Sequence, residues 1–231
     1  TEDPRGAPVR WYGHSLGAIY ALERERGARV VQLNHARVNG ECGILCVLDW
    51  DRLAAEPGLT DPTLIGLPAD EPLWSWDFDA FELLNSNRSP FLNPADPRHS
   101  GAFEDWMSFL NHGHPATPTG VTDEHGWGSP GQPRTWLRAE RSEDQLVQAV
   151  LDGAAVVSAG AFARVEIDGV GPGGLVSVDG EGSLSIHVEA LPEVDVDRVA
   201  VLVNCDLAFE LAATDPGAVI KLDGVWPLAL A

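Results

Sequence analysis

The first two-thirds of the chain alternates between helical and strand-like spacing of its apolar residues. Apolar positions recur every three or four residues, with a glycine after each segment, and so predict helices at residues 16–26, 103–110 and 143–151. Short apolar runs predict strands at residues 29–33, 78–84 and 116–121. Because alternating strands and helices are typical of βα units with parallel strands, this part predicts an α/β fold.

The pattern changes after about residue 160. Polar and apolar residues then alternate at period two, with glycine-rich turns between the runs, which predicts strands at residues 163–168, 183–190 and 198–203. We therefore expect two domains, an α/β domain at 1–159 and a small all-β, sandwich-like module at 160–231. The last apolar run, 225–231, resembles a strand cut short, and both chain ends suggest a fragment of a longer protein.

Composition narrows the classes of function. The 231 residues include 15 basic and 35 acidic side chains, for a net charge of −20, which disfavours non-specific binding to nucleic acid. No apolar run approaches the roughly 20 residues of a membrane-spanning helix. Basic residues are arginine except for Lys221, and this acidic, lysine-poor composition suits a periplasmic or secreted protein, although a cytoplasmic location stays open.

Three cysteines are too few for a disulfide scaffold. Cys42 and Cys46 are close enough in sequence to pair, but the spacing does not require it. We expect buried thiols rather than a disulfide between Cys42 and Cys46.

The segment Gly13-His14-Ser15-Leu16-Gly17 matches the G-x-S-x-G elbow that carries the nucleophile of many serine hydrolases. Such an elbow follows a strand, whereas only twelve residues that include Pro4, Gly6 and Pro8 precede this one. We favour Ser15 as the N-cap of an ordinary helix, and a serine hydrolase that uses Ser15 remains an alternative.

Two histidines and two carboxylates lie in or directly after predicted strands. They are His35, Glu82, Asp123 and His125. In a parallel βα barrel the carboxyl ends of the strands meet on one face, where functional sites are built. Mixed imidazole and carboxylate ligands suit Zn²⁺, Mn²⁺ or Fe²⁺, so these positions predict a metal site.

Other aromatic and imidazole side chains have structural interpretations. His112 and His114 follow the helix predicted at 103–110, where histidine favours the negative end of the helix dipole, so we expect capping. Trp74, Trp76 and Phe78 interleave with acidic residues, and we expect them to pack in the core and at the rim of the barrel.

The segments around these positions resemble a known family. They are residues 30–37, 78–85, 110–126, 165–169 and 194–199. Through them the chain resembles the PHP-type metal-dependent phosphoesterases, and within these the carbaryl-hydrolase-like metallohydrolases of the CehA/McbA family. The resemblance covers nearly the whole chain.

The resemblance implies the C-terminal portion of a distorted (βα)7 barrel with two or three divalent metal ions at the strand ends. His35 would occupy the family's Asn-His-Pro-Arg position, with Ala36 in place of proline, and Asp123 and His125 would be the closing Asp-x-His ligands. Glu82 would either bind metal or orient the site from behind. Arg37 would be a catalytic residue that meets an anionic or carbonyl group of the substrate.

The implied reaction is hydrolysis of a phosphoester, ester or carbamate bond in a small molecule by metal-bound hydroxide. The family's opening His-x-His and Thr-Asp-His segments are absent from these 231 residues. The resemblance therefore implies that a companion N-terminal chain or segment supplies the other ligands. A second alternative is a non-catalytic binding module, in which the β domain binds the partner.

Overall fold

The computed structural model describes residues 13–37, 42–86, 88–125, 131–177, 179–215 and 217–229. The chain divides into two compact units: Thr1–Glu82 with Pro90–Ala116 (unit 1), and Leu83–Ser89 with Thr117–Ala231 (unit 2). The boundary predicted near residue 160 lies inside unit 2. Besides the predicted β module, unit 2 contains residues 83–89, one helix and three whole strands: β5 (Thr117–Val121), β6 (Arg134–Leu137) and β7 (Ala155–Ser158). β5 contacts both β6 and β7.

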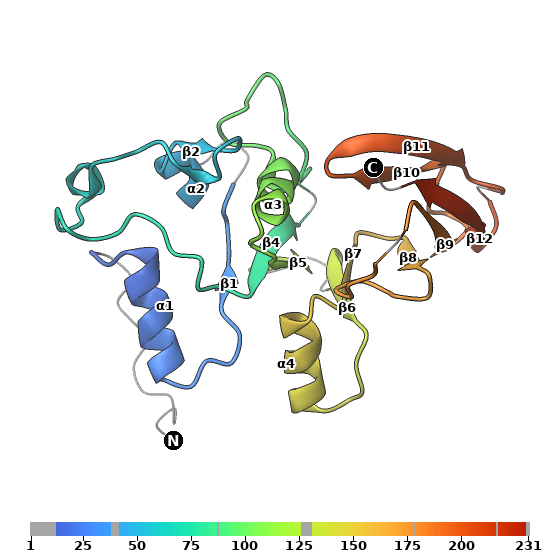
Figure 1. The fold of residues 1–231 in the computed structure, drawn as a ribbon, viewed down its shortest axis with the longest axis horizontal. Helices are drawn as coiled ribbons and strands as arrows, with labels where there is room; N and C mark the ends of the chain where they lie inside the picture. Colours follow the sequence, from blue (N-terminus) through green and yellow to red (C-terminus); the bar gives the residue numbers. More distant parts are fainter. Residues whose placement is uncertain are drawn as a thin grey trace. The chain divides into compact units, whose positions relative to one another are not determined.

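Unit 1 combines short strands with two longer helices (Figure 1). Its elements are α1 (Leu16–Glu25), β1 (Gln32–Leu33), α2 (Ile44–Val47), β2 (Trp50–Asp51), β3 (Glu56–Pro57), the 3₁₀ helix η1 (Pro62–Ile65), the start of β4 (Ala80–Asn85) and α3 (Ala102–Asn111). β1 pairs with β4 in parallel, with Leu33 opposite Phe81. The predicted α/β class and this parallel pairing are confirmed, whereas the barrel stays a prediction.

An aromatic cluster forms the core of unit 1. Trp50 contacts Trp74, Trp76 and Phe109 at ring-centroid separations of 4.4, 5.8 and 5.5 Å. Phe78 lies against the same Trp74, Trp76 and Phe109 rings. The predicted packing role of Trp74, Trp76 and Phe78 is therefore confirmed, and these rings hold α3 against the segment that leads into β4.

Unit 2 contains the end of β4 and the remaining strands. Its other elements are β5, β6, α4 (Glu143–Leu151), β7, β8 (Phe162–Ile167), β9 (Glu181–Glu189), β10 (Arg198–Val203), β11 (Asp206–Ala212) and β12 (Ile220–Ala229). β6 and β7 pair in antiparallel fashion, and β4 lies beside β5. The strand predicted at 225–231 belongs to β12 as far as Ala229, and its last two residues lie outside the described residues.

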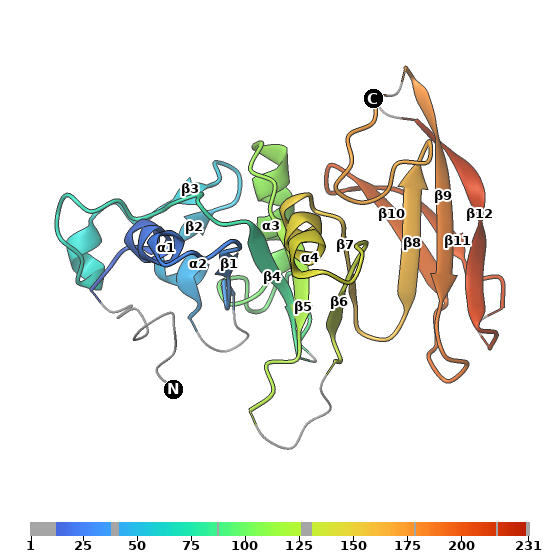
Figure 2. The ribbon, with the colours of Figure 1, turned by 90° about the horizontal axis from the view of Figure 1, so that it is seen from below.

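The second half of unit 2 consists of two small sheets. β9 is central in an antiparallel sheet of order β12-β9-β8, and β10 pairs with β11 in a second sheet (Figure 2). Leu184, Ile186 and Val188 of β9 are buried, and apolar side chains of β10 and β11 pack against them. Alternate positions of β9 therefore bury one face of the central strand, as its period-two pattern predicts.

The prediction of buried thiols at Cys42 and Cys46 is wrong, because the two cysteines form a disulfide. Cys46 lies in α2 and Cys42 two residues before this helix, so their Cα atoms are only 5.2 Å apart. This separation is within the usual range for a disulfide. Cys205 is exposed and lies between β10 and β11.

Candidate functional site

The first predicted pair, His35 and Glu82, comes together in unit 1. His35 follows β1 by two residues, and Glu82 lies in β4, the parallel partner of β1. His35 Nδ1 lies 3.0 Å from Glu82 Oε1, and the backbone N–H of His35 donates to the same oxygen at 3.2 Å. Glu82 is buried, whereas the His35 side chain is half exposed. One buried carboxylate thus holds both the ring and the backbone of this histidine.

His35 adopts a backbone conformation that is uncommon for a non-glycine residue, with φ of 52°. Such conformations carry a cost and persist where the surrounding contacts enforce them, and they cluster at functional sites. Here both the backbone N–H and the ring of His35 contact Glu82. When Nδ1–H donates to the carboxylate, Nε2 carries the lone pair, which is the orientation that metal-ligating histidines use.

The second predicted pair, Asp123 and His125, comes together in unit 2. Asp123 follows β5 by two residues and has φ of 49°, so it shares the left-handed backbone of His35. His125 Nε2 lies 3.0 Å from Asp123 Oδ1, and the His125 side chain is 86 % exposed. Ser86 fixes the start of this segment, because its N–H donates to the Val121 carbonyl and its hydroxyl to that of Thr122.

The donors of these two pairs fit a divalent metal ion of the zinc, manganese or iron type. Imidazole nitrogen and carboxylate oxygen are suitable ligands, and a carboxylate on Nδ1, such as Glu82 on His35, is the contact that orients a metal-binding histidine. Each pair belongs to its own unit, and the structure describes each by itself. The metal role of the four residues stays a prediction.

Arg37 lies in a buried ion cluster. Its Nε donates to Asp105 Oδ2 at 2.6 Å, and its Nη1 donates to the Arg98 carbonyl at 2.6 Å. Arg52 Nε donates to the other carboxylate oxygen of Asp105 at 2.7 Å. Asp105 is completely buried and the Arg37 side chain only 5 % exposed. These contacts give Arg37 a structural role, and the predicted contact with substrate stays untested.

Ser15 has the environment of a helix N-cap. Its side chain accepts a hydrogen bond from the Ala18 N–H, as the favoured interpretation predicts, and its hydroxyl donates to Glu71. Ser15 is buried, whereas His14 is exposed. The residues before Gly13, where a nucleophile elbow requires a strand, lie outside the described residues.

The two histidines after α3 have different partners. His112 is the C-cap residue of α3, and its Nδ1 lies 2.8 Å from the Ser108 carbonyl, so its predicted capping role is confirmed. His114 instead stacks on Trp76, with ring centroids 3.8 Å apart and planes only 4° from parallel. The His114 N–H also donates to the Phe109 carbonyl at 2.9 Å, so His114 helps to cap α3 through its backbone while its ring packs on the aromatic core.

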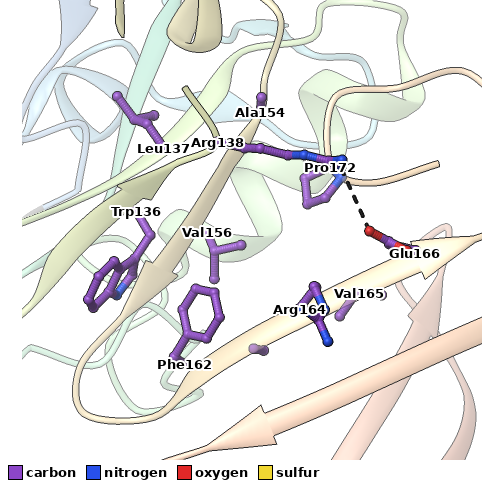
Figure 3. Close-up of a pocket in the computed structure, with 11 residues that line it drawn as sticks. Trp136, Leu137, Arg138, Ala154, Val156, Phe162, Arg164, Val165, Glu166 and Pro172 are labelled. Carbon is purple, nitrogen blue, oxygen red and sulfur yellow. Dashed lines mark ion pairs between the residues drawn. The ribbon is translucent and has the colours of Figure 1, made fainter. Parts of the chain in front are cut away.

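A pocket in unit 2 was not predicted from the sequence. It has a volume of about 390 Å³ and lies between the β6–β7 pair and β8. Figure 3 shows Trp136 and Phe162 at one end of the pocket and Arg138 and Glu166 at the other. The two rings are 5.3 Å apart, and Arg138 Nη1 lies 3.7 Å from Glu166 Oε1. Arg164 adds a second guanidinium to the lining.

One sequence signal was available for this pocket. Thr135 and Trp136 are residue types that favour strands, and β6 occupies 134–137. The position of β8 beside this strand follows from tertiary structure, which the local pattern does not specify.

Comparison with known proteins yields no match to a family model, to a curated protein or to a solved structure. In the described part of the chain, no helix is both long enough and apolar enough to cross a membrane.

Proposed function

We propose that this chain is part of a PHP-type metallohydrolase that cleaves phosphoester, ester or carbamate bonds of small molecules. The single observation that carries the proposal is the contact of the buried Glu82 carboxylate with both the ring and the backbone N–H of His35. His35 follows β1, which pairs in parallel with β4. The Asp123–His125 pair supports the proposal. Like His35, Asp123 lies two residues after a strand and has a left-handed backbone conformation.

In this proposal His35, Asp123 and His125 hold the metal ions, and Glu82 acts as a positioning residue through His35. Divalent ions, when bound, supply Lewis-acid activation of water and of the substrate oxygen. Glu82 fixes the His35 tautomer, so that Nε2 presents its lone pair. The C-terminal part of a (βα)7 barrel is the proposed framework, and the remaining ligands come from a companion N-terminal chain or segment.

Hydrolysis assays test this function. The protein, with any companion chain that co-purifies, is loaded with Zn²⁺, Mn²⁺ or Fe²⁺ and tested on nitrophenyl phosphodiester, nitrophenyl ester and naphthyl carbamate substrates. We expect Asp123→Ala to lower kcat/KM by about 100-fold or more, because losing a ligand removes several kcal/mol of stabilisation. Glu82→Gln should lower kcat/KM by about 10–100-fold, the usual cost of losing the carboxylate that orients a metal-binding histidine.

The matched control is His112→Ala, since His112 caps α3 and takes no part in the proposed site. This variant should keep its activity. Equal activity of the wild type, Asp123→Ala and His35→Ala proteins would contradict the proposal.

The pocket in unit 2 favours a second function, non-catalytic binding of a small molecule. Its volume lies within the usual range for ligand sites. Trp136 and Phe162 offer an apolar surface. Glu166 pairs with Arg138, so Arg164 supplies the remaining positive charge of the lining, and an aromatic carboxylate or phosphate is the class that fits.

Isothermal titration calorimetry with naphthalene carboxylates and naphthyl phosphate tests this binding function. Arg164→Ala should weaken binding at least about tenfold, the equivalent of one charge-assisted hydrogen bond. Arg198→Ala is the matched control, because Arg198 lies on β10 and pairs with Glu210. Binding that is absent in the wild type, or equal in both variants, would exclude the pocket as the site.

A further inference from the structure

A group of three metal-ligating side chains lies in unit 1 outside the site described above. Cys42, Cys46 and His99 each offer one ligand atom, and these atoms all lie within 4.8 Å of one another. Among the described residues this is the one such group of three or more. In the structure the two sulfur atoms form a disulfide.

We propose that the disulfide between Cys42 and Cys46 masks a zinc site, which forms with His99 when the disulfide is reduced. Thiolate and imidazole are the ligands that Zn²⁺ prefers. Two thiolates on one zinc ion lie about 3.8 Å apart, given Zn–S bonds of about 2.3 Å in tetrahedral geometry. The bonded sulfur atoms must therefore move apart by side-chain rotation after reduction, and one His99 ring nitrogen already lies within 4.8 Å of both.

His99 has a carboxylate partner that suits this role. Its Nδ1 lies 2.7 Å from Asp96 Oδ1, so the carboxylate favours the tautomer in which Nε2 carries the lone pair. This carboxylate–histidine pairing is the one that supports zinc-bound histidines in other proteins. Asp96 thus serves as a positioning residue, and a solvent molecule completes the four-coordinate site.

The loop that carries His99 is held close to the cysteines. The Ser100 hydroxyl donates to the Asp96 carbonyl at 2.7 Å, which closes the turn that contains His99. Arg98 Nη2 donates to the Cys46 carbonyl at 3.4 Å, and Arg37 Nη1 donates to the Arg98 carbonyl. These contacts do not involve the sulfur atoms, so they remain when the disulfide opens.

The proposed reaction is balanced by a dithiol reductant. The dithiol is oxidised to its own disulfide while Cys42 and Cys46 gain two electrons and two protons as thiols. Zn²⁺ then displaces the two thiol protons and binds both thiolates and His99 Nε2. The same two sulfur atoms therefore serve as a structural cross-link when oxidised and as metal ligands when reduced.

Cobalt(II) spectroscopy tests the proposal, because thiolate–cobalt bonds give a charge-transfer band that oxygen and nitrogen ligands do not. The full chain with Cys205→Ser is reduced with dithiothreitol, desalted without oxygen and titrated with Co²⁺ and then Zn²⁺. We expect a tetrahedral thiolate spectrum at one Co²⁺ per chain, abolished by Zn²⁺. The same protein left oxidised should show no such band.

His99→Ala should weaken Co²⁺ binding at least tenfold, whereas His112→Ala, a control at the end of α3, should leave it unchanged. The Asp123→Ala background should keep the band, which separates this site from the proposed hydrolase site. Circular dichroism checks that each variant folds. A reduced protein without a thiolate band, or a band that His99→Ala leaves intact, would overturn the proposal.

Discussion

Asp105 is a buried carboxylate that pairs with two arginines inside unit 1. It is completely buried and bonded to both Arg37 and Arg52. Asp105→Ala leaves the buried Arg37 guanidinium without its carboxylate, and we expect a loss of about 3–5 kcal/mol in the free energy of unfolding. Urea denaturation followed by tryptophan fluorescence measures it. Asp70→Ala, at an exposed position, is the control and should change stability by less than about 0.5 kcal/mol.

Tyr20 has a buried hydroxyl that, within the described part of the chain, has no hydrogen-bond partner. Burial, followed by repulsion from Asp77, raises the pKa of the Tyr20 phenol above its ordinary value of 10.0. The folded state therefore keeps the proton, while the unfolded chain ionises near pH 10, so the stabilising contribution is complete below that pH and is lost as the pH rises further.

Tyr20→Phe should be neutral or stabilising at pH 7, because it removes an unsatisfied polar atom from the core. Above about pH 10 its advantage over the wild type should grow by up to about 1.4 kcal/mol per pH unit. Urea denaturation at pH 7 and at pH 10.5 measures both. A variant that loses more than about 1 kcal/mol at both pH values would contradict this account.

At the scale of single elements, the contribution of the N-cap of helix α1 to stability can be measured directly. Ser15→Ala removes the cap on the Ala18 N–H and the bond to Glu71, and we expect a loss of about 1–2 kcal/mol. Ser142→Ala removes the equivalent cap of α4 at an exposed position and should cost about 0.5–1 kcal/mol. Thermal denaturation compares the two variants.

The Ser15→Ala variant also distinguishes the proposed metallohydrolase from the serine hydrolase alternative. If Ser15 is only a cap, then Ser15→Ala keeps hydrolytic activity at a temperature where it is folded. Loss of both activity and labelling by a fluorophosphonate probe would favour the serine hydrolase alternative.

The three longer helices could be predicted more fully than the strands, whereas the short helices α2 and η1 were not predicted. The N-caps of α1 and α4, Ser15 and Ser142, are visible in sequence, and α3 shows a regular apolar stripe. β6 and β7 pair across the whole of α4, so their partnership depends on contacts distant in sequence. β1 has only two residues, which is shorter than the apolar run that predicted it.

For the whole molecule, sequence predicted where the candidate site residues fall but not their partners. His35 and Asp123 do follow strands, as their positions after apolar runs indicate. Three arrangements depend on side chains more than 40 residues apart in the sequence. They are the contact of Glu82 with His35, the ion cluster around Arg37 and the position of His99 beside the disulfide. No local sequence pattern encodes such partnerships, so they become visible only in the structure.

Metal content per chain tests the central claim most directly. Protein purified without chelator, with its disulfide intact so that Cys42 and Cys46 cannot bind metal, is analysed by elemental mass spectrometry. The account predicts one or more equivalents of zinc, manganese or iron, lost in His35→Ala and in Asp123→Ala and kept in His112→Ala. Protein that stays metal-free after incubation with each ion, or that keeps its metal in both variants, would contradict it.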